Sequence, residues 1–215
     1  FDKKLTFDRK DATQFNIGFR HLFYLDKYKN PKSSKSYKYD LLFLGTAHSD
    51  RYLVSSRVAE LCQSLGLKSY MFYYMHSRLV YFYKKVFDQS FKEFDYKKLS
   101  FESLNSDELV ALYNSSKVIL DINHPMQNGL TMRTFEAIGA KKKLITTNED
   151  VKNYPFYSPN NFLVIDRENI VLNKEFFETD YSELNSDWYR KCSLEGWMHD
   201  VFIGSGNEDW KAVMS

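Results

Sequence analysis

A strand, a polar loop, a helix and a second strand follow one another between residues 118 and 147, and this succession constrains the fold most. The run 118–122 is apolar, and the loop after it contains Gly129. Apolar residues then recur at helical spacing up to Gly139, and 144–147 is again strandlike. Strands that alternate with helices build parallel sheets, so we predict an α/β fold with a doubly wound, Rossmann-like parallel sheet. The helix would then begin at the carboxyl edge of the sheet, where such folds bind ligands.

The start of this helix has the chemistry of an anion site. Three backbone N–H groups are expected to be free there, those of Leu130, Thr131 and Met132. Arg133 adds a cation one turn in, and Glu136 offers a carboxylate to sugar hydroxyls. The helix rises only about 7.5 Å from Thr131 to Glu136, which suits a diphosphate beside a ribose. The alternative is that Gly129 is an ordinary turn glycine and Glu136 a surface carboxylate.

The spacing Gly129-x-x-x-Arg133-x-x-Glu136-x-x-Gly139, between its two strands, resembles the donor-binding segment of GT-B glycosyltransferases. The resemblance is to bacterial enzymes of polysaccharide and lipopolysaccharide assembly. It implies that Glu136 holds the nucleotide ribose and that the glycine loop lies against the diphosphate and the transferred sugar. Many retaining members have a second glutamate eight residues before the first, where this chain has Asn128. The anomeric outcome therefore stays open.

The resemblance also implies the chemistry. The donor would be a nucleoside diphosphate sugar and the acceptor a glycan or a lipid-linked glycan. Helix ends and basic residues take the place of a divalent ion, so no metal and no cofactor are expected. The sequence contains no Asp-x-Asp motif of the kind that holds such an ion in other glycosyltransferases. Catalytic roles fall to His124, Arg133 and Glu136, and in an inverting enzyme the general base would come from the other domain.

Further binding residues are expected at neighbouring strand ends. The loop after the strand 39–44 contributes Gly45, Thr46, His48 and Arg51. For His48 and Arg51 the alternative is a helix cap and an exposed basic residue. The resemblance implies that main-chain groups of Ser100, Phe101 and Glu102 face the base. The donor sugar would lie beside His124, Gln127 and Asn128, close to Gly129, Leu130 and Thr131. We expect Asp121 to orient this loop.

Length and charge limit the organisation of the chain. Its 215 residues hold one sizeable α/β domain and are too few for the two domains of a GT-B enzyme. We expect a tail of the first domain and a linker over 1–38, the donor-binding domain over 39–185, and over 186–215 a helix that crosses back. The N-terminal GT-B domain would be absent, and Phe1 in place of Met fits a cut chain. The 30 basic and 28 acidic residues are interspersed, which argues against nucleic acid as a partner.

A cytoplasmic protein is expected, one that could lie at the inner face of the membrane. The charged N-terminus does not resemble a signal peptide and no apolar run is long enough to cross a bilayer, so we expect any membrane contact to be peripheral. Cys62 and Cys192 are expected to be buried thiols. The 16 Tyr and 18 Phe suit a core, or else a surface for a lipid-linked acceptor or a missing domain. Three basic residues of the predicted helix 77–87 could face lipid head groups or a diphosphate, or simply form its wet face: Arg78, Lys84 and Lys85.

Local signals predict the remaining elements. Residues 5–12 should form a strand end and a turn, 29–38 a solvated linker, and 51–65 a helix that ends at Gly66. Lys141–Lys143 should satisfy the end of the preceding helix and keep the approach to the next strand soluble. A single helix is expected from about Ser186 through His199.

Two other functions compete with glycosyl transfer. A non-catalytic nucleotide- or sugar-binding module of a glycan-assembly complex would keep the site without turning over. A dehydrogenase or epimerase is disfavoured, because Gly45-Thr-Ala-His-Ser-Asp50 lacks the Gly-x-Gly-x-x-Gly pattern.

Overall fold

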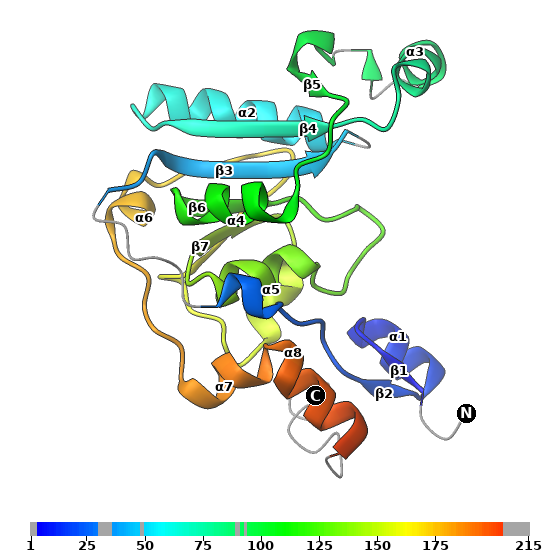
Figure 1. The fold of residues 1–215 in the computed structure, drawn as a ribbon, viewed down its shortest axis with the longest axis vertical. Coiled ribbons are helices and arrows are strands. Elements are labelled where there is room, and N and C mark those ends of the chain that lie inside the picture. The colour runs from blue at the N-terminus through cyan, green and yellow to red at the C-terminus, as the bar shows by residue number, and fades with distance from the viewer. Residues whose placement is uncertain (1–3, 30–35, 48–49, 89–90, 93, 204–215) are drawn as a thin grey trace.

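The computed structural model describes residues 4–29, 36–47, 50–88, 91–92 and 94–203. A six-stranded parallel sheet in the order β5-β4-β3-β6-β7-β8 forms its centre (Figure 1). The strands are β3 (Tyr39–Thr46), β4 (Ser69–Tyr74), β5 (Leu99–Ser100), β6 (Ser116–Asp121), β7 (Lys143–Thr146) and β8 (Phe162–Val164). Strands β3, β4 and β5 extend the sheet in one direction, and β6, β7 and β8 extend it in the other. The sheet is therefore doubly wound, and the strand order reverses between β3 and β6. The predicted α/β, Rossmann-like class is confirmed.

Alternate residues of the central strands feed two separate cores. Leu42 pairs with Ile119 in register and both face one core, whereas Leu41 and Val118 face the other. These strands are apolar on both sides because helices cover both faces of the sheet. Helices α4 (Ser106–Asn114) and α5 (Met132–Gly139) cover the first face, and α2 (Arg51–Ser64) and α6 (Lys174–Glu178) cover the second.

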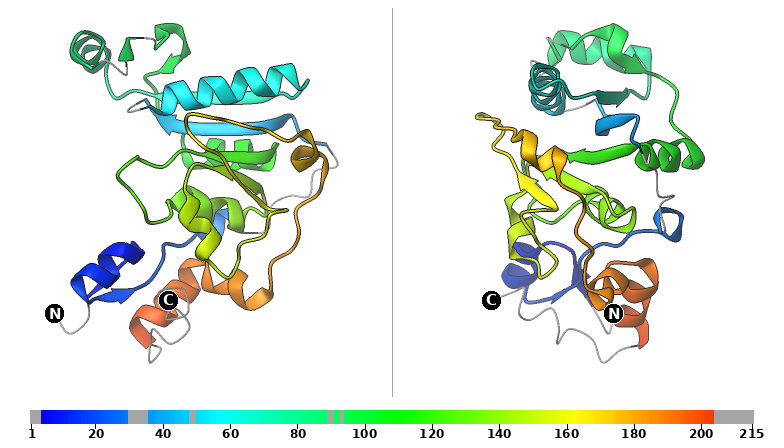
Figure 2. Two further views of the ribbon diagram at one scale, coloured as in Figure 1. Left: turned by 180° about the vertical axis from the view of Figure 1, so that it is seen from behind. Right: turned by 90° about the vertical axis from the view of Figure 1, so that its left-hand side faces the viewer.

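Both ends of the described chain lie at the same end of the molecule (Figure 2). The parallel strands β1 (Leu5–Thr6) and β2 (Gly18–Phe19) flank α1 (Arg9–Phe15), and α7 (Ser186–Lys191), α8 (Leu194–Met198) and a π-helical turn, η5 (His199–Ile203), complete the C-terminal part. Tyr24 joins the two segments, since its N–H donates to Cys192 O at 2.8 Å and its carbonyl accepts from Leu194 N–H at 2.9 Å. The ring of Tyr24 also packs on Gly139, where a Cβ would lie 2.6 Å from it. A glycine at position 139 thus has a packing reason.

The other elements are short. Helix α3 (Arg78–Phe87) follows β4, and single turns form η1 (Asp26–Tyr28), η3 (Tyr96–Lys98) and η4 (Glu149–Asn153). Among the described residues, no helix is long and apolar enough to cross a membrane. Both cysteines are buried and free, and burial raises the pKa of each thiol to about 12.

Three local predictions were wrong. A helix, α1, replaces the expected turn after the first strand, because Asp8 caps it by accepting from the N–H groups of Lys10 and Asp11. The expected C-terminal helix is broken at Ser193, whose hydroxyl caps α8. Lys142 and Lys143 are buried and do not keep the strand soluble: their ammonium groups donate to Asn114 O and to Phe176 O. Most of the predicted linker, 30–35, lies outside the described residues.

Candidate functional site

A cavity of about 150 Å³ lies between the carboxyl ends of β3 and β6, where the strand order reverses. We call it the switch-point pocket, and it is lined by Phe43, Leu44, Gly45, Arg51, Asp121, Ile122, Thr131, Met132 and Arg133. Four predicted binding residues therefore come together here: Gly45, Arg51, Thr131 and Arg133. They arrive from β3, the start of α2 and the start of α5, as the strand-end argument requires.

Asp121 organises this pocket from the end of β6. Its Oδ2 accepts hydrogen bonds from Thr131 Oγ1 at 2.9 Å and Thr146 Oγ1 at 3.4 Å. Burial raises the pKa of Asp121, an effect that the Arg133 charge and the Thr131 bond oppose. The carboxylate thereby ties two strand ends to the start of α5, which fits the orienting role expected for it.

Two arginines supply positive charge. Arg51 Nε donates to Ile122 O at 2.9 Å and its Nη1 to Thr46 Oγ1 at 3.3 Å, and burial lowers the pKa of Arg51. Arg133 Nη1 is buried and has no hydrogen-bond partner among the residues that the structure describes. Burial lowers the pKa of Arg133, but its neighbours, Tyr113 and Glu136 first, leave that pKa raised overall. An unpartnered, charged donor of this kind is suited to an anionic ligand.

The first turn of α5 adds backbone donors to the same pocket. Thr131 precedes the helix in extended conformation, and its hydroxyl is bound to Asp121 instead of capping the helix. Within the described parts of the chain, the N–H groups of Met132 and Arg133 find no acceptor. They point out of the helix start with the positive end of its dipole behind them, which is the arrangement of an anion site.

Glu136 lies one turn further along α5. Its Oε2 accepts a hydrogen bond from the Tyr113 hydroxyl at 2.8 Å. Burial, and then the Glu136 charge, raise the pKa of Tyr113, and the same two causes raise that of Tyr28. The tyrosines thus hold this carboxylate in place, and its contact with a ribose stays a prediction.

A second, larger cavity of about 490 Å³ opens beside the loop between β6 and α5. We call it the amide cleft, because its lining is rich in amide side chains: Lys10, Asn123, Pro125, Gln127, Asn128, Thr147, Asn148, Glu149, Asp150, Lys152, Asn153 and Arg167. Amides can both donate to and accept from sugar hydroxyls. Of the predicted sugar contacts, Gln127 and Asn128 line this cleft. His124 lines neither cavity and is exposed, and its Nδ1 accepts from Met126 N–H at 3.2 Å.

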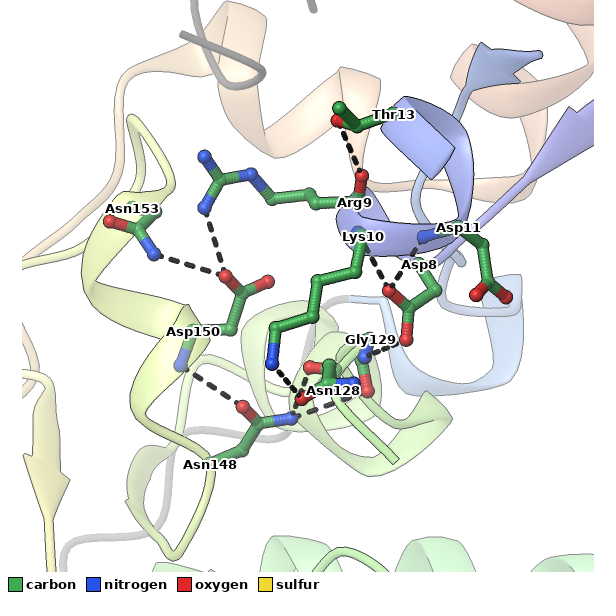
Figure 3. Close-up of polar contacts among 10 residues, drawn as sticks. All are labelled: Asp8, Arg9, Lys10, Asp11, Thr13, Asn128, Gly129, Asn148, Asp150 and Asn153. Carbon is green, nitrogen blue, oxygen red and sulfur yellow. Dashed lines mark hydrogen bonds and ion pairs between the residues drawn. The ribbon is translucent and has the colours of Figure 1, made fainter. Parts of the chain in front are cut away.

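The N-terminal helix α1 closes one side of the amide cleft (Figure 3). Lys10 Nζ donates to Asn128 Oδ1 at 2.9 Å, and Arg9 pairs with Asp150 at 2.9 Å. Asp8 Oδ2 accepts from Gly129 N–H at 2.9 Å, and a Cβ on Gly129 would lie 2.7 Å from the Phe7 carbonyl oxygen. The close backbone approach expected at Gly129 is therefore made here by the Phe7–Asp8 segment.

Sequence reasoning missed two residues that shape the cleft, Asn148 and Arg167. Asn148 Nδ2 donates to Asn128 O at 2.9 Å and to Gly129 O at 3.2 Å, which holds the glycine loop. Arg167 donates to Asn123 O at 2.6 Å and pairs with Asp50 at 2.6 Å. Asn148 follows the predicted strand 144–147, and Arg167 follows β8, so the strand-end argument used for Asp121 would have found them.

The remaining predicted site residues lie elsewhere. Leu130 is buried in the core and lines neither of the two cavities described above. Ser100 ends β5 and pairs with Tyr74 of β4, and its hydroxyl donates to Glu102 O at 2.8 Å. Phe101 follows it, and its ring centroid lies 5.6 Å from Arg78. His48 lies outside the described residues. No cluster of three or more metal-binding side chains occurs within the described ranges.

Comparison with known proteins connects part of the chain to one class of enzyme. Residues 74–179 match the model of a family described as "Glycosyl transferase-like". The matched segment runs from the end of β4 through α6, so it contains β6, α5 and most of the amide cleft. This segment is glycosyltransferase-like.

Solved structures and curated proteins give two further comparisons. A solved structure described as "Crystal structure of GtfA/B complex" aligns with a TM-score of 0.42 and 14% sequence identity, over 79% of this chain and 34% of that chain. The present chain thus spans about a third of that solved chain. No curated protein matches the sequence.

Proposed function

We propose that this chain is the donor-binding half of a GT-B glycosyltransferase, which transfers a sugar from a nucleoside diphosphate sugar to a glycan or lipid-linked acceptor. The observation that carries the proposal is the switch-point pocket, where the unpartnered Arg133 Nη1 and the free N–H groups of α5 converge. The glycosyltransferase-like segment around them supports it.

In this proposal the diphosphate lies in the switch-point pocket. Departure of the diphosphate places negative charge on its oxygens, and fixed N–H dipoles with Arg51 and Arg133 stabilise that charge. No metal is needed for this step. Glu136, held by Tyr113, accepts hydrogen bonds from the ribose.

The donor sugar then lies toward the amide cleft, beside Gln127 and Asn128. His124, from the same loop, is the third residue proposed to contact this sugar. That domain brings the acceptor and, in an inverting reaction, the general base. The work would take place at the cytoplasmic face of the membrane, in surface polysaccharide or lipopolysaccharide assembly.

Thermal unfolding with a nucleotide panel tests the proposal. UDP, GDP, dTDP, ADP and CMP are added, each with and without EDTA. A ligand at about 100 times its dissociation constant should raise the midpoint by roughly 5–10 °C. Arg133→Gln should abolish the shift, whereas the matched control Arg57→Gln, on the exposed side of α2, should keep it. A shift that Arg133→Gln leaves intact would place the nucleotide elsewhere.

Substitution of Glu136 tests the ribose contact separately. Glu136→Ala should weaken nucleotide binding by about 1.5–3 kcal/mol, because a charged acceptor is removed. Calorimetric titration measures the affinity, and circular dichroism checks the fold. Unchanged affinity in a folded variant would contradict this role.

The alternative, a non-catalytic binding module, makes the same predictions for binding. It is separated by assaying the chain together with its partner domain: sugar transfer supports the enzyme, and tight donor binding without transfer or hydrolysis supports the module.

A further inference from the structure

Helix α3 turns its apolar side to solvent. Five side chains lie between 58 and 81% exposed and recur at the spacing i, i+3, i+4, i+7 and i+8: Leu79, Phe82, Tyr83, Val86 and Phe87. We call them the α3 stripe. This is the pattern that normally faces a core. A contiguous apolar surface of this kind marks a contact site.

The opposite side of α3 is fixed to the protein. The Tyr81 hydroxyl donates to Phe94 O at 3.2 Å, and Lys85 Nζ donates to Lys92 O at 2.6 Å and to Phe94 O at 3.1 Å. Lys84 Nζ lies 4.7 Å from the Phe91 ring centroid. The helix is therefore held in the orientation that exposes the stripe.

Basic residues border the stripe on both sides. At about 100° per residue, Arg78 and Lys85 lie next to Phe82, and Lys84 lies beyond the opposite border. Among the described residues, no carboxylate forms an ion pair with any of these three cations. The stripe thus carries unneutralised positive charge at its edges.

This combination determines the partner. A stable protein interface uses about 20–30 residues a side, far more than a ten-residue helix presents. An aromatic stripe bordered by lysine and arginine is the pattern of a helix that lies in the surface of an anionic bilayer. We propose that α3 is an interfacial membrane helix, with the stripe inserted among lipid chains, the exposed Arg78 at anionic head groups, and Lys84 and Lys85 adding positive charge beside the stripe.

The position of α3 suits such a contact. It lies at the end of the molecule opposite to β1 and η5, where the described chain begins and ends (Figures 1 and 2). It also follows directly from the carboxyl end of β4, the sheet edge that carries both cavities. Membrane contact through α3 would hold this edge near the bilayer. The inference rests on α3 alone and does not require the proposed donor site.

Vesicle flotation tests the proposal with the whole chain. Vesicles of phosphatidylcholine are compared with vesicles that also contain phosphatidylglycerol, at low and at high salt. Each unpaired cation should strengthen binding to the anionic vesicles by about fivefold at low salt. The double substitution Phe82→Ser with Phe87→Ser should weaken it by at least about tenfold, because two aromatic side chains no longer insert.

The control is Phe15→Ser, since Phe15 is comparably exposed but lies on α1. It should float like the unaltered chain, and both variants should keep the unfolding midpoint. Equal binding to both vesicle types, or a double variant that still floats, would overturn the proposal. So would a dimer in light scattering that the double variant dissociates, because the stripe would then be covered by a second copy.

Discussion

Helices α5 and α3 are both strongly amphipathic, yet they bury opposite sides. The apolar side of α5 packs into the core through Phe135, Ala137 and Ile138, and its polar side presents Arg133 and Glu136 at the carboxyl edge of the sheet. In α3 only Tyr81 is buried and the apolar stripe faces outward. Periodicity therefore shows that a helix has two sides, and the surrounding chain determines which side is covered.

The cause lies in what each helix meets. Helix α5 lies between β6 and β7 in the chain and packs on the face of the sheet that Leu42, Ile119 and Leu144 make apolar. Helix α3 lies beyond the edge strand β5, where the sheet offers no such face. Its contacts come instead from the short segment around Phe91 and Phe94.

The largest expected difference between the helices is in stability. Phe135 is fully buried and stacks on His21, with ring centroids 4.7 Å apart. Phe135→Ala should lower the free energy of unfolding by about 3–5 kcal/mol. Phe87→Ala in the stripe should change it by no more than about 0.5 kcal/mol. Urea denaturation measures both.

A large loss for Phe87→Ala would break the comparison, because the stripe would then be buried in solution. If Phe135→Ala does not fold, Phe135→Leu gives the same sign with a smaller loss.

Sequence reasoning found the switch-point pocket because its parts obey local rules. Strand ends, the glycine loop and the start of α5 each have a short-range signal, and a parallel sheet brings them to one edge. Gly45, Arg51, Thr131 and Arg133 were therefore identified together. Helix α2 and its end at Gly66, which has a φ of 73°, followed from the same kind of signal.

The amide cleft could be predicted only in part. Lys10 and Asn128 are 118 residues apart, and nothing in the local sequence of either residue indicates the other. The burial of Lys143 has the same origin: its ammonium group donates to Phe176 O and Thr179 Oγ1, which a distant turn supplies. Side chains whose partners come from far along the chain cannot be placed by periodicity or by charge.

The basic residues that follow α5 give the second prediction. Burial lowers the pKa of Lys142 and of Lys143 to about 8, so the folded chain loses these protons before the unfolded chain does. Between about pH 8 and 10 these two groups therefore hold more protons in the unfolded state, and they should raise stability with pH by about 1–3 kcal/mol. The buried thiols of Cys62 and Cys192 act in the opposite direction, because they ionise first in the unfolded chain. Urea denaturation from pH 7.5 to 9.5 measures the slope.

Lys143→Met should flatten that slope, and Lys84→Met on the border of the α3 stripe should leave it unchanged. The thiols are present in both variants, so the difference in slope from the unaltered chain isolates the lysine, and equal slopes for Lys143→Met and the unaltered chain would show that Lys143 keeps its proton in the fold. The range stops below pH 10, because unfolded tyrosines begin to ionise there, whereas burial raises the pKa of Tyr24, Tyr113 and Tyr154 in the fold.

The smallest effect concerns the hydroxyl that holds Glu136 on the polar side of α5. Tyr113→Phe removes its hydrogen bond to Glu136 Oε2 and should cost about 0.5–1.5 kcal/mol of stability. Because the carboxylate is then less well held, the nucleotide-induced shift in unfolding midpoint should also become smaller. Tyr83→Phe, on the exposed α3 stripe, removes a hydroxyl from the same residue type and should change neither quantity. If both variants reduced the shift equally, the hydroxyl of Tyr113 would not position Glu136. The proposed nucleotide contact of α5 would then rest on Arg133 alone.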